Sequence, residues 1–376
     1  MTVAPAIEAT GVGGFRRLRV ICKQRESRTI TSFLLEPMEE TGWRSFEAGQ
    51  FLVFKIPVGD ARGFVLRNYS VSSSPDRRGA YRITVKREQA PATGLPAGLA
   101  SSYLHDAVSV GDVLEAEGPR GEFRLDRSSV RPVVLLSGGV GLTPLVSMLH
   151  ALAAGSDRSV TFIHACDDGD VHALRQEVQS LAATRPGITS HFCYRFPSEA
   201  DVAGACFDSR GVVGRDVLQR LLPLDDYDFY LCGPPVFMQA VYRLLRGLGV
   251  AKPRIAYEFF GPATVLEADC SSPAEPVASG VDDLPVASAT SQTIEVTFRR
   301  SGRSAPWNDA AGSLLAFAES LGLDPDFSCR AGICSTCKTR LIDGEVSYVE
   351  EPLDDPGPGE VLICCAKPAR SLVLDL

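Results

Sequence analysis

The spacing of the cysteines near the end of the chain limits the possible folds more than any other feature. Five of the eleven cysteines fall within residues 329–376, and Cys329, Cys334 and Cys337 follow a C-x4-C-x2-C spacing. This spacing, completed by a distant fourth cysteine, is typical of [2Fe–2S] ligation. Backbone N–H groups must turn toward the sulfurs of a negatively charged cluster, and Gly332 allows the loop that tight turn. The pattern predicts an iron–sulfur domain.

The fourth ligand is either Cys364 or Cys365. Cys364 ends a predicted strand, 361–364, and Cys365 follows it directly. Adjacent strand residues point to opposite faces, so only one of the two can reach the cluster. A zinc site is the alternative, but zinc sites favour paired C-x2-C spacings. The odd number of cysteines and the scatter of the other six argue against a disulfide framework.

The first third of the chain is expected to be a small antiparallel barrel. Apolar segments rich in Val, Ile and Phe alternate there with Gly, Pro and Asp turns, a pattern typical of short strands. The expected strands are 17–22, 31–36, 51–57, 68–72, 81–87 and 113–117, with one helix at 99–104.

From residue 131 onward, strands alternate with helices, which predicts a parallel sheet with crossover helices. The expected strands are 133–136, 160–164, 191–196, 211–213 and 229–232, and the expected helices 145–153, 174–181 and 237–248. The first strand leads into Gly138, Gly139, Gly141, Thr143 and Pro144. Glycines there let the backbone approach a pyrophosphate at the helix N-terminus. The loop departs from G-x-G-x-x-G and lacks the usual acidic residue further on, which disfavours a dehydrogenase-type Rossmann domain.

Residues 263–291 are rich in Ala, Ser, Pro and Asp and contain five acidic and no basic residues, the composition of a linker. Beyond it we expect strands at 293–298, 339–342, 361–364 and 372–376 and a helix at 313–321. Residues 263–376 hold 18 acidic and 8 basic residues, against 28 and 30 before them. Nucleic-acid binding is disfavoured because Lys and Arg are not clustered. The acidic part either docks on a basic partner or serves solubility.

A second candidate site lies in the barrel, at Arg67-Asn68-Tyr69-Ser70. A flavin needs an aromatic face, a cation for its phosphate and a hydroxyl near N5, and this segment supplies all three. Downstream, Gly98, Ala100, Ser101 and Ser102 place Gly and Ser at a helix N-terminus, which favours an anion. Between these segments, Lys86 and Arg87 add positive charge.

Residues 15–262 resemble the ferredoxin–NADP reductase superfamily, most of all the reductase portion of flavohaemoglobins, and residues 291–376 resemble plant-type ferredoxins. The resemblance rests on AGQF, RNYS, VKRE, GLASSYLHD, VGDVLEAEGPRGEF, LSGGVGLTPL, YLCGPPVFM, YEFFGP and LICCAKP, which occur in family order. It implies a flavin-binding barrel at 13–127, an NAD-binding α/β domain at 128–262, a linker at 263–290 and a β-grasp (α+β) ferredoxin domain at 291–376.

The resemblance also implies roles for particular residues. Ser70, Cys232, Glu258 and Phe260 would form the catalytic group, with Ser70 near flavin N5 and Phe260 over the flavin face. Cys364 would be the fourth cluster ligand. The implied cofactor-binding residues are Arg67, Asn68, Tyr69, Ser70, Val85, Lys86, Gly98, Ala100, Ser101, Ser102, Gly138, Gly139, Gly141, Thr143, Pro144, Cys232, Gly233 and Pro234.

The implied function is that of an NADH-dependent reductase with FAD and a [2Fe–2S] cluster. FAD is favoured over FMN, and NADH over NADPH because Asp167 and Asp168 would repel a 2′-phosphate. A flavin takes two electrons at once and releases them singly, as a one-electron cluster requires. The expected partner is a two-component Rieske-type oxygenase or demethylase. A hybrid-cluster protein or a cytochrome P450 as acceptor, or a stand-alone flavin or quinone reductase, are the alternatives.

No haem chemistry is implied, because no globin sequence is present. No signal peptide and no run of about 18 apolar residues is visible, so we expect a cytoplasmic protein without a membrane span.

Overall fold

The chain, described here from a computed structural model, divides into two compact units, Met1–Phe260 and Gly261–Leu376. The described residues are 14–39, 42–57, 63–89, 98–260, 294–323, 325, 327, 332, 337–349, 352 and 356–376. The predicted linker therefore lies outside the described residues. The architecture is the predicted one: an antiparallel barrel, a parallel α/β sheet and a β-grasp domain.

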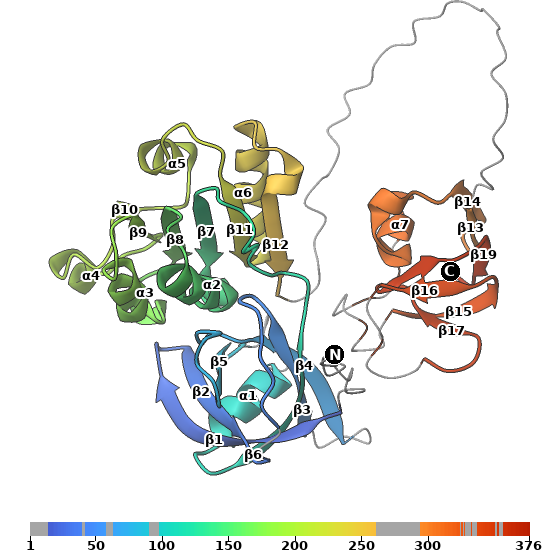
Figure 1. Cartoon of the computed structure of the whole chain (residues 1–376), viewed down its shortest axis with the longest axis horizontal. Coiled ribbons are helices and arrows are strands. Elements are labelled where there is room, and N and C mark those ends of the chain that lie inside the picture. Colours follow the sequence, from blue (N-terminus) through green and yellow to red (C-terminus); the bar gives the residue numbers. More distant parts are fainter. Residues whose placement is uncertain are drawn as a thin grey trace, which may run out of the picture. The chain divides into compact units, whose positions relative to one another are not determined.

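The barrel is a six-stranded antiparallel sheet in the order β4-β3-β6-β1-β2-β5 (Figure 1). Its strands are β1 (Arg16–Arg25), β2 (Ile30–Pro37), β3 (Phe51–Pro57), β4 (Phe64–Ser70), β5 (Tyr81–Lys86) and β6 (Val113–Arg120). A bridge between Val71 and Ile83 joins the chain just after β4 to β5 and closes the sheet. Helix α1 (Leu99–Asp106) adds Ala100 and Leu104 to the barrel's core.

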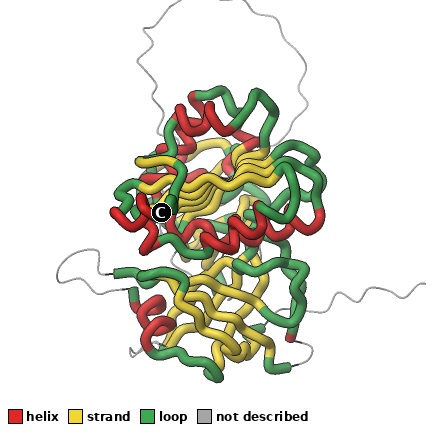
Figure 2. Tube along the Cα trace, turned by 90° about the vertical axis from the view of Figure 1, so that its left-hand side faces the viewer, coloured by secondary structure: helices red, strands yellow, loops and turns green. Residues whose placement is uncertain are grey.

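The second sheet is parallel, in the order β10-β9-β8-β7-β11-β12. Its strands are β7 (Val133–Gly138), β8 (Val160–Cys166), β9 (Ile188–Tyr194), β10 (Ser209–Arg210), β11 (Asp228–Gly233) and β12 (Ile255–Phe259). Strand β7 is buried along its whole length, as expected for a parallel strand with both faces covered. Figure 2 shows helices on both sides of this sheet. They are α2 (Leu142–Gly155), α3 (Arg175–Ala182), α4 (Glu199–Ala203), α5 (Arg215–Leu221) and α6 (Pro235–Gly247).

The order of this sheet marks its ligand crevice. The chain builds outward from β7 through β8 and β9 to β10, then returns to the other side of β7 with β11 and β12. In open α/β sheets, ligands bind beyond the carboxyl ends of the strands where the order reverses. That point lies between β7 and β11, which end at Gly138 and Gly233.

The barrel and the parallel sheet share one apolar core. Ile30, Phe123 and Leu125 of the barrel side belong to the same buried cluster as Leu145 and Met148 of α2. Across this boundary the Asp126 N–H also donates to the Tyr230 hydroxyl, at 2.9 Å. Because apolar burial contributes about 25 cal/mol per Å², a shared core holds the two parts together.

The second unit has a five-stranded sheet, β14-β13-β19-β15-β17, in which β13 and β19 run parallel. Its elements are β13 (Glu295–Phe298), β14 (Arg303–Pro306), α7 (Leu314–Ser320), β15 (Lys338–Asp343), β17 (Glu360–Leu362) and β19 (Leu372–Leu374). A separate pair joins β16 (Val346–Tyr348) to β18 (Ala366–Pro368). Phe298 and Phe317 anchor its core, where α7 covers the sheet.

Two predicted strands are wrong. The strand expected at 211–213 lies instead at Ser209–Arg210, because Gly211 takes a φ of +106° and the chain turns there. The strand expected at 361–364 ends at Leu362, and residues 363–365 form a turn in which the Cys365 N–H donates to the Leu362 carbonyl. Six further elements were not predicted from the sequence: β12, β14, β16, β18, α4 and α5.

Candidate flavin, nucleotide and cluster sites

Strand β4 carries the four residues expected to bind the flavin. It pairs with β3, so that Ser70 lies opposite Phe51 and Arg67 opposite Phe54. Residues two apart share a strand face, so Arg67 lies on the face of Tyr69, and Asn68 on that of Ser70. Arg67 is exposed, whereas Tyr69 packs against the barrel core with its ring edge toward Phe54. Burial raises the pKa of Tyr69, so its hydroxyl stays protonated.

The anion site predicted from the sequence falls at the start of α1, where the two serines have different contacts. The Ser101 hydroxyl donates to the Gly98 carbonyl and accepts from the Glu88 N–H, so it fastens the helix to the chain after β5. The Ser102 hydroxyl is buried and has no hydrogen-bond partner among the described residues. A buried polar atom without a partner is costly. An anion bound at the free N–H groups of this first turn could satisfy it.

The other residues expected near the flavin phosphates lie on β5. Val85 is buried, and its carbonyl contacts Nε2 of His105 on α1 at 2.9 Å. The Lys86 ammonium pairs with Glu88 at 3.2 Å on the surface.

The glycine loop and the CGPP segment meet backbone to backbone. A Cβ on Gly141 would lie 2.3 Å from the Cys232 carbonyl oxygen, and a Cβ on Gly233 would lie 3.0 Å from the Gly138 nitrogen. Gly139 has a φ of +51°, which favours glycine. Beyond the loop, the first turn of α2 contains Thr143, whose hydroxyl donates to the Val140 carbonyl, and the buried Pro144. Pro234 precedes α6 at the end of the CGPP segment.

The expected catalytic residues come together where this crevice faces the barrel. Cys232 on β11 pairs in register with Glu258 on β12. Burial raises the pKa of Glu258 to about 8, and the nearby Ser70 hydroxyl partly offsets this effect. Neither Ser70 Oγ nor Glu258 Oε2 has a well-formed hydrogen bond among the described residues. Phe260 packs against the core that contains Cys232.

The electrostatics of this group favour neutral side chains. Burial, followed by the neighbouring Glu258, raises the pKa of the Cys232 thiol well above its usual range. Two buried oxygens without partners and an uncharged thiol suit a polar but uncharged ring system with hydrogen-bonding edges, such as a flavin or a nicotinamide. The residues present therefore fit both groups.

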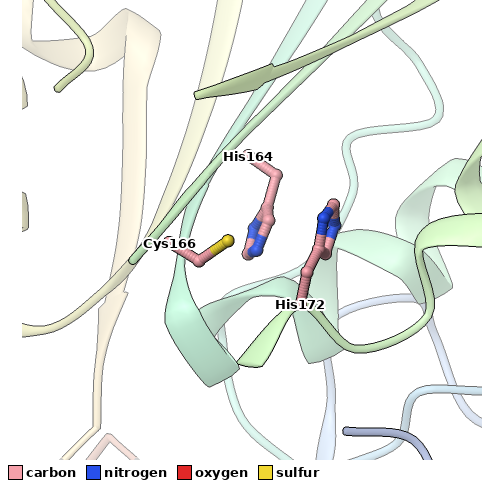
Figure 3. A group of neighbouring side chains, drawn as sticks. All are labelled: His164, Cys166 and His172. Atoms are coloured by element: carbon pink, nitrogen blue, oxygen red, sulfur yellow. The ribbon is translucent and has the colours of Figure 1, made fainter. Parts of the chain in front are cut away.

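His164 and Cys166 at the end of β8 form a cluster with His172, in which both histidines are buried and Cys166 is half-buried (Figure 3). Their ligand atoms lie within 4.8 Å of one another, but the two imidazoles stack, with ring centroids 4.4 Å apart and planes at 28°. A histidine nitrogen binds a metal in its ring plane, so rings stacked in this way do not both address one ion. The cluster is structural: His164 Nδ1 lies 2.8 Å from Ser137 Oγ, just before the glycine loop. Sequence reasoning missed this cluster, and no motif marks it.

In the second unit, the structure describes part of the predicted cluster site. Cys337, Cys364 and Cys365 are all buried, whereas Cys329 and Cys334 lie outside the described residues. The strand alternation used to choose between Cys364 and Cys365 is wrong, because the two residues lie in a turn and not in a strand; the assignment of Cys364 as the ligand stays a prediction. Their partners differ: the Gly332 N–H donates to Cys364 Sγ at 3.4 Å, while the Cys365 thiol donates to the Leu362 carbonyl. The backbone N–H aimed at the buried Cys364 sulfur fits the negative charge of an iron–sulfur cluster.

Comparisons with known proteins agree with these three sites. The family described as "Oxidoreductase FAD-binding domain" matches residues 17–125, "Oxidoreductase NAD-binding domain" matches 135–243, and "2Fe-2S iron-sulfur cluster binding domain" matches 296–369. A flavohemoprotein of Bordetella pertussis is 42% identical over 263 residues, which are 70% of this chain and 64% of that protein. The chain thus spans less than two thirds of the length of this curated relative.

Two solved structures extend the comparison. The FAD/NAD binding domain of nitric oxide dioxygenase from Vibrio cholerae is 38% identical, covers 66% of this chain and 99% of that one, and has a TM-score of 0.58. Phthalate dioxygenase reductase is 25% identical, covers 96% of this chain and 98% of that one, and has a TM-score of 0.55.

A flavin-type barrel joined to a parallel nucleotide sheet, with an iron–sulfur domain on the same chain, defines the class of modular flavin- and nicotinamide-binding oxidoreductases. The chain belongs to the ferredoxin–NADP reductase superfamily and carries a fused [2Fe–2S] domain. The cofactors of these domains are FAD, NAD and the cluster. Among the described residues, no helix is both long enough and apolar enough to cross a membrane.

Proposed function

We propose that this chain oxidises NADH and passes the electrons, through FAD and the [2Fe–2S] cluster, one at a time to a partner protein. The observation that carries the proposal is the meeting of Ser70, Cys232 and Glu258 between the barrel and the nucleotide crevice. The flavin would supply the change from two-electron to one-electron transfer. The protein's residues would bind it, orient the nicotinamide against it and exclude water.

Each residue in this group would have a separate task. Ser70 would offer its hydroxyl to the flavin edge, and the protonated Glu258 would present a neutral hydrogen-bonding group at the same place. Cys232 would contact the nicotinamide, and Phe260 would cover the flavin until the nicotinamide replaces it. Arg67, Tyr69 and the first turn of α1 would hold the rest of the flavin. Cys364, with Cys329, Cys334 and Cys337, would hold the cluster.

The preference for NADH is supported by the residues after β8. Three aspartates lie there within four residues: Asp167, Asp168 and Asp170. Arg195 pairs with Asp167 at 2.7 Å, and the Asp168 carboxylate accepts from the Val171 N–H. One arginine does not balance three acids, and the remaining negative charge would repel a 2′-phosphate.

The partner is proposed from the likeness in domain order. Phthalate dioxygenase reductase, described as "a modular structure for electron transfer from pyridine nucleotides to [2Fe-2S]", matches nearly all of both chains. We therefore infer that this chain is the reductase component of a two-component Rieske-type oxygenase or demethylase. An oxygenase component encoded beside it would be the acceptor to test.

A pair of electron acceptors tests the electron path. Ferricyanide is small enough to take electrons directly from the flavin. Cytochrome c is a protein that accepts one electron, and we expect it to take that electron from the cluster. We expect NADH to drive the reduction of both by the intact chain. Cys337→Ser should retain ferricyanide reduction but lose at least about tenfold in cytochrome c reduction, about 1.4 kcal/mol. Equal cytochrome c rates in the two proteins would remove the cluster from the path.

A further inference from the structure

An ion pair joins the barrel to the parallel sheet close to the proposed flavin site. Arg82 on β5 makes two parallel hydrogen bonds to Glu177 on α3, with N–O distances of 2.6 and 2.7 Å. The two side chains are only 18% and 25% exposed. Two-pronged pairs of this kind fix orientation as well as distance. The contact lies within one compact unit, Met1–Phe260.

On the barrel side, the same arginine holds the segment that follows Ser70. The Arg82 side chain donates to both the hydroxyl and the carbonyl of Ser72, and its backbone carbonyl accepts from the Ser72 N–H at 2.7 Å. The Ser72 hydroxyl is also bonded to Thr84 of β5 at 2.8 Å. Ser72, two residues beyond Ser70, is therefore fixed from several directions.

On the nucleotide side, Glu177 reaches the helix that begins at the glycine loop. Its Oε1 atom lies 2.6 Å from Nε2 of His150 on α2. Burial alone would raise the pKa of Glu177, but hydrogen bonds from His150 and Arg82 outweigh it and hold the pKa at about 2. A chain of contacts thus runs from Ser72 through Arg82 and Glu177 to α2.

The charges of Arg82 and Glu177 also act on the carboxyl of Glu26. Burial raises the pKa of Glu26, hydrogen bonding from Ser32 and the charge of Arg82 lower it, and the charge of Glu177 raises it. Arg82 therefore lowers the pKa of both carboxyls, together with His150 in the case of Glu177. Removing one member of a buried pair leaves the other charge uncompensated.

We propose that the Arg82–Glu177–His150 contact is a positioning device that sets the nicotinamide-binding loop against the flavin-binding strand. This inference rests on the proposed function. Hydride transfer requires the reacting atoms to be about 3–3.5 Å apart, and a misplacement of about 1 Å costs on the order of a hundredfold in rate. The contact would act on that distance through Ser72, just beyond β4, and through His150 on α2, which begins at the glycine loop. The side-chain hydrogen bonds of Arg82 and Glu177 to each other, and of Glu177 to His150, link protein elements, so their proposed role is positioning.

Rapid-reaction kinetics on the full chain separate positioning from binding. Flavin absorbance is followed after anaerobic mixing with NADH at several concentrations, which gives a limiting reduction rate and a dissociation constant. Glu177→Gln and Arg82→Gln should each lower the limiting rate at least about tenfold. The dissociation constant should stay within about threefold. Because the two residues act as one unit, the double variant should be no slower than the worse single variant.

A conservative variant and a matched control keep the test decisive. Glu177→Asp retains the charge and should fold, but its shorter reach should still slow reduction measurably. Glu39→Gln removes the exposed Arg17–Glu39 pair, whose side chains are 59% and 48% exposed, and should leave the rate unchanged. Flavin content and the melting temperature are recorded for each protein.

The outcomes distinguish this proposal from the proposed function. If NADH does not reduce the flavin of the unaltered chain, the proposed function fails. If it does, and the Glu177 variants melt earlier but reduce flavin at the unaltered limiting rate, the contact is purely structural and the positioning proposal is overturned.

Discussion

The carboxyl of Glu258 lies where ionisation is unfavourable. Its pKa is raised by burial to about 8, whereas the carboxyl of an unfolded chain titrates near its usual value. A group with a raised pKa stabilises the folded state most below the unfolded pKa, and that contribution is lost as the pH rises through the folded pKa. Folding should therefore become less favourable, on account of Glu258, from about pH 5 to about pH 8.

Replacing Glu258 by glutamine, a neutral side chain of the same shape, removes this dependence of stability on pH. We expect Glu258→Gln to lose little stability at about pH 5. As the pH rises, the variant should become more stable than the unaltered protein. The gain should be on the order of 3 kcal/mol by about pH 8. Thermal unfolding of the flavin-free proteins across this range measures it. A difference between the two proteins that does not change with pH would contradict a raised pKa.

The adjacent cysteines make a second comparison at the same scale. Cys364 receives an N–H from Gly332, whereas Cys365 donates its own thiol hydrogen to a carbonyl. We expect Cys364→Ser to lose the [2Fe–2S] absorbance and bound iron, and Cys365→Ser to keep them. Iron, acid-labile sulfide and the visible spectrum are the readouts. The reverse pattern would make Cys365 the ligand.

At the scale of elements, the contact between the glycine loop and β11 leaves no room for a side chain. A methyl group on Gly141 would lie 2.3 Å from the Cys232 carbonyl oxygen, while one on Gly247 of α6 meets nothing within 4 Å. We expect Gly141→Ala to cost at least about 3 kcal/mol of stability and to abolish flavin reduction by NADH. Gly247→Ala should change neither the stability nor the reduction of the flavin, because the added methyl group fits the helix. Normal reduction in Gly141→Ala would show that the two loops need not touch.

Local patterns explain which elements could be predicted. The glycine loop after β7, the cysteine loop and the segment of β4 are each carried by neighbouring residues, so their sequence reveals them. Strand β12 escaped because its five residues form a strand only by pairing with β11. The turn at Cys364 and Cys365 was not predicted, because nothing in their sequence distinguishes a turn from a strand. Pairings across the fold, such as Arg82 with Glu177 or His164 with Ser137, join residues far apart in sequence and have no local signal.

At the scale of the whole molecule, the proposed electron path runs through three sites. The barrel and the parallel sheet share a core, which fixes the flavin site against the nucleotide crevice. The cluster belongs to a second compact unit. The net charge of the chain is −8, and the acidic excess lies in residues 263–376. If this unit delivers the electrons, as proposed, its negative charge predicts a partner with a basic docking surface.

Anaerobic titration with NADH, followed through the visible spectrum, tests this path most directly. We predict that NADH bleaches both the flavin and the [2Fe–2S] absorbance of the intact chain, and that NADPH does so less readily. Bleaching of the flavin with an unchanged or absent cluster signal would contradict electron transfer from the flavin to the cluster. A flavin that stays oxidised would contradict the proposed NADH-dependent reductase activity.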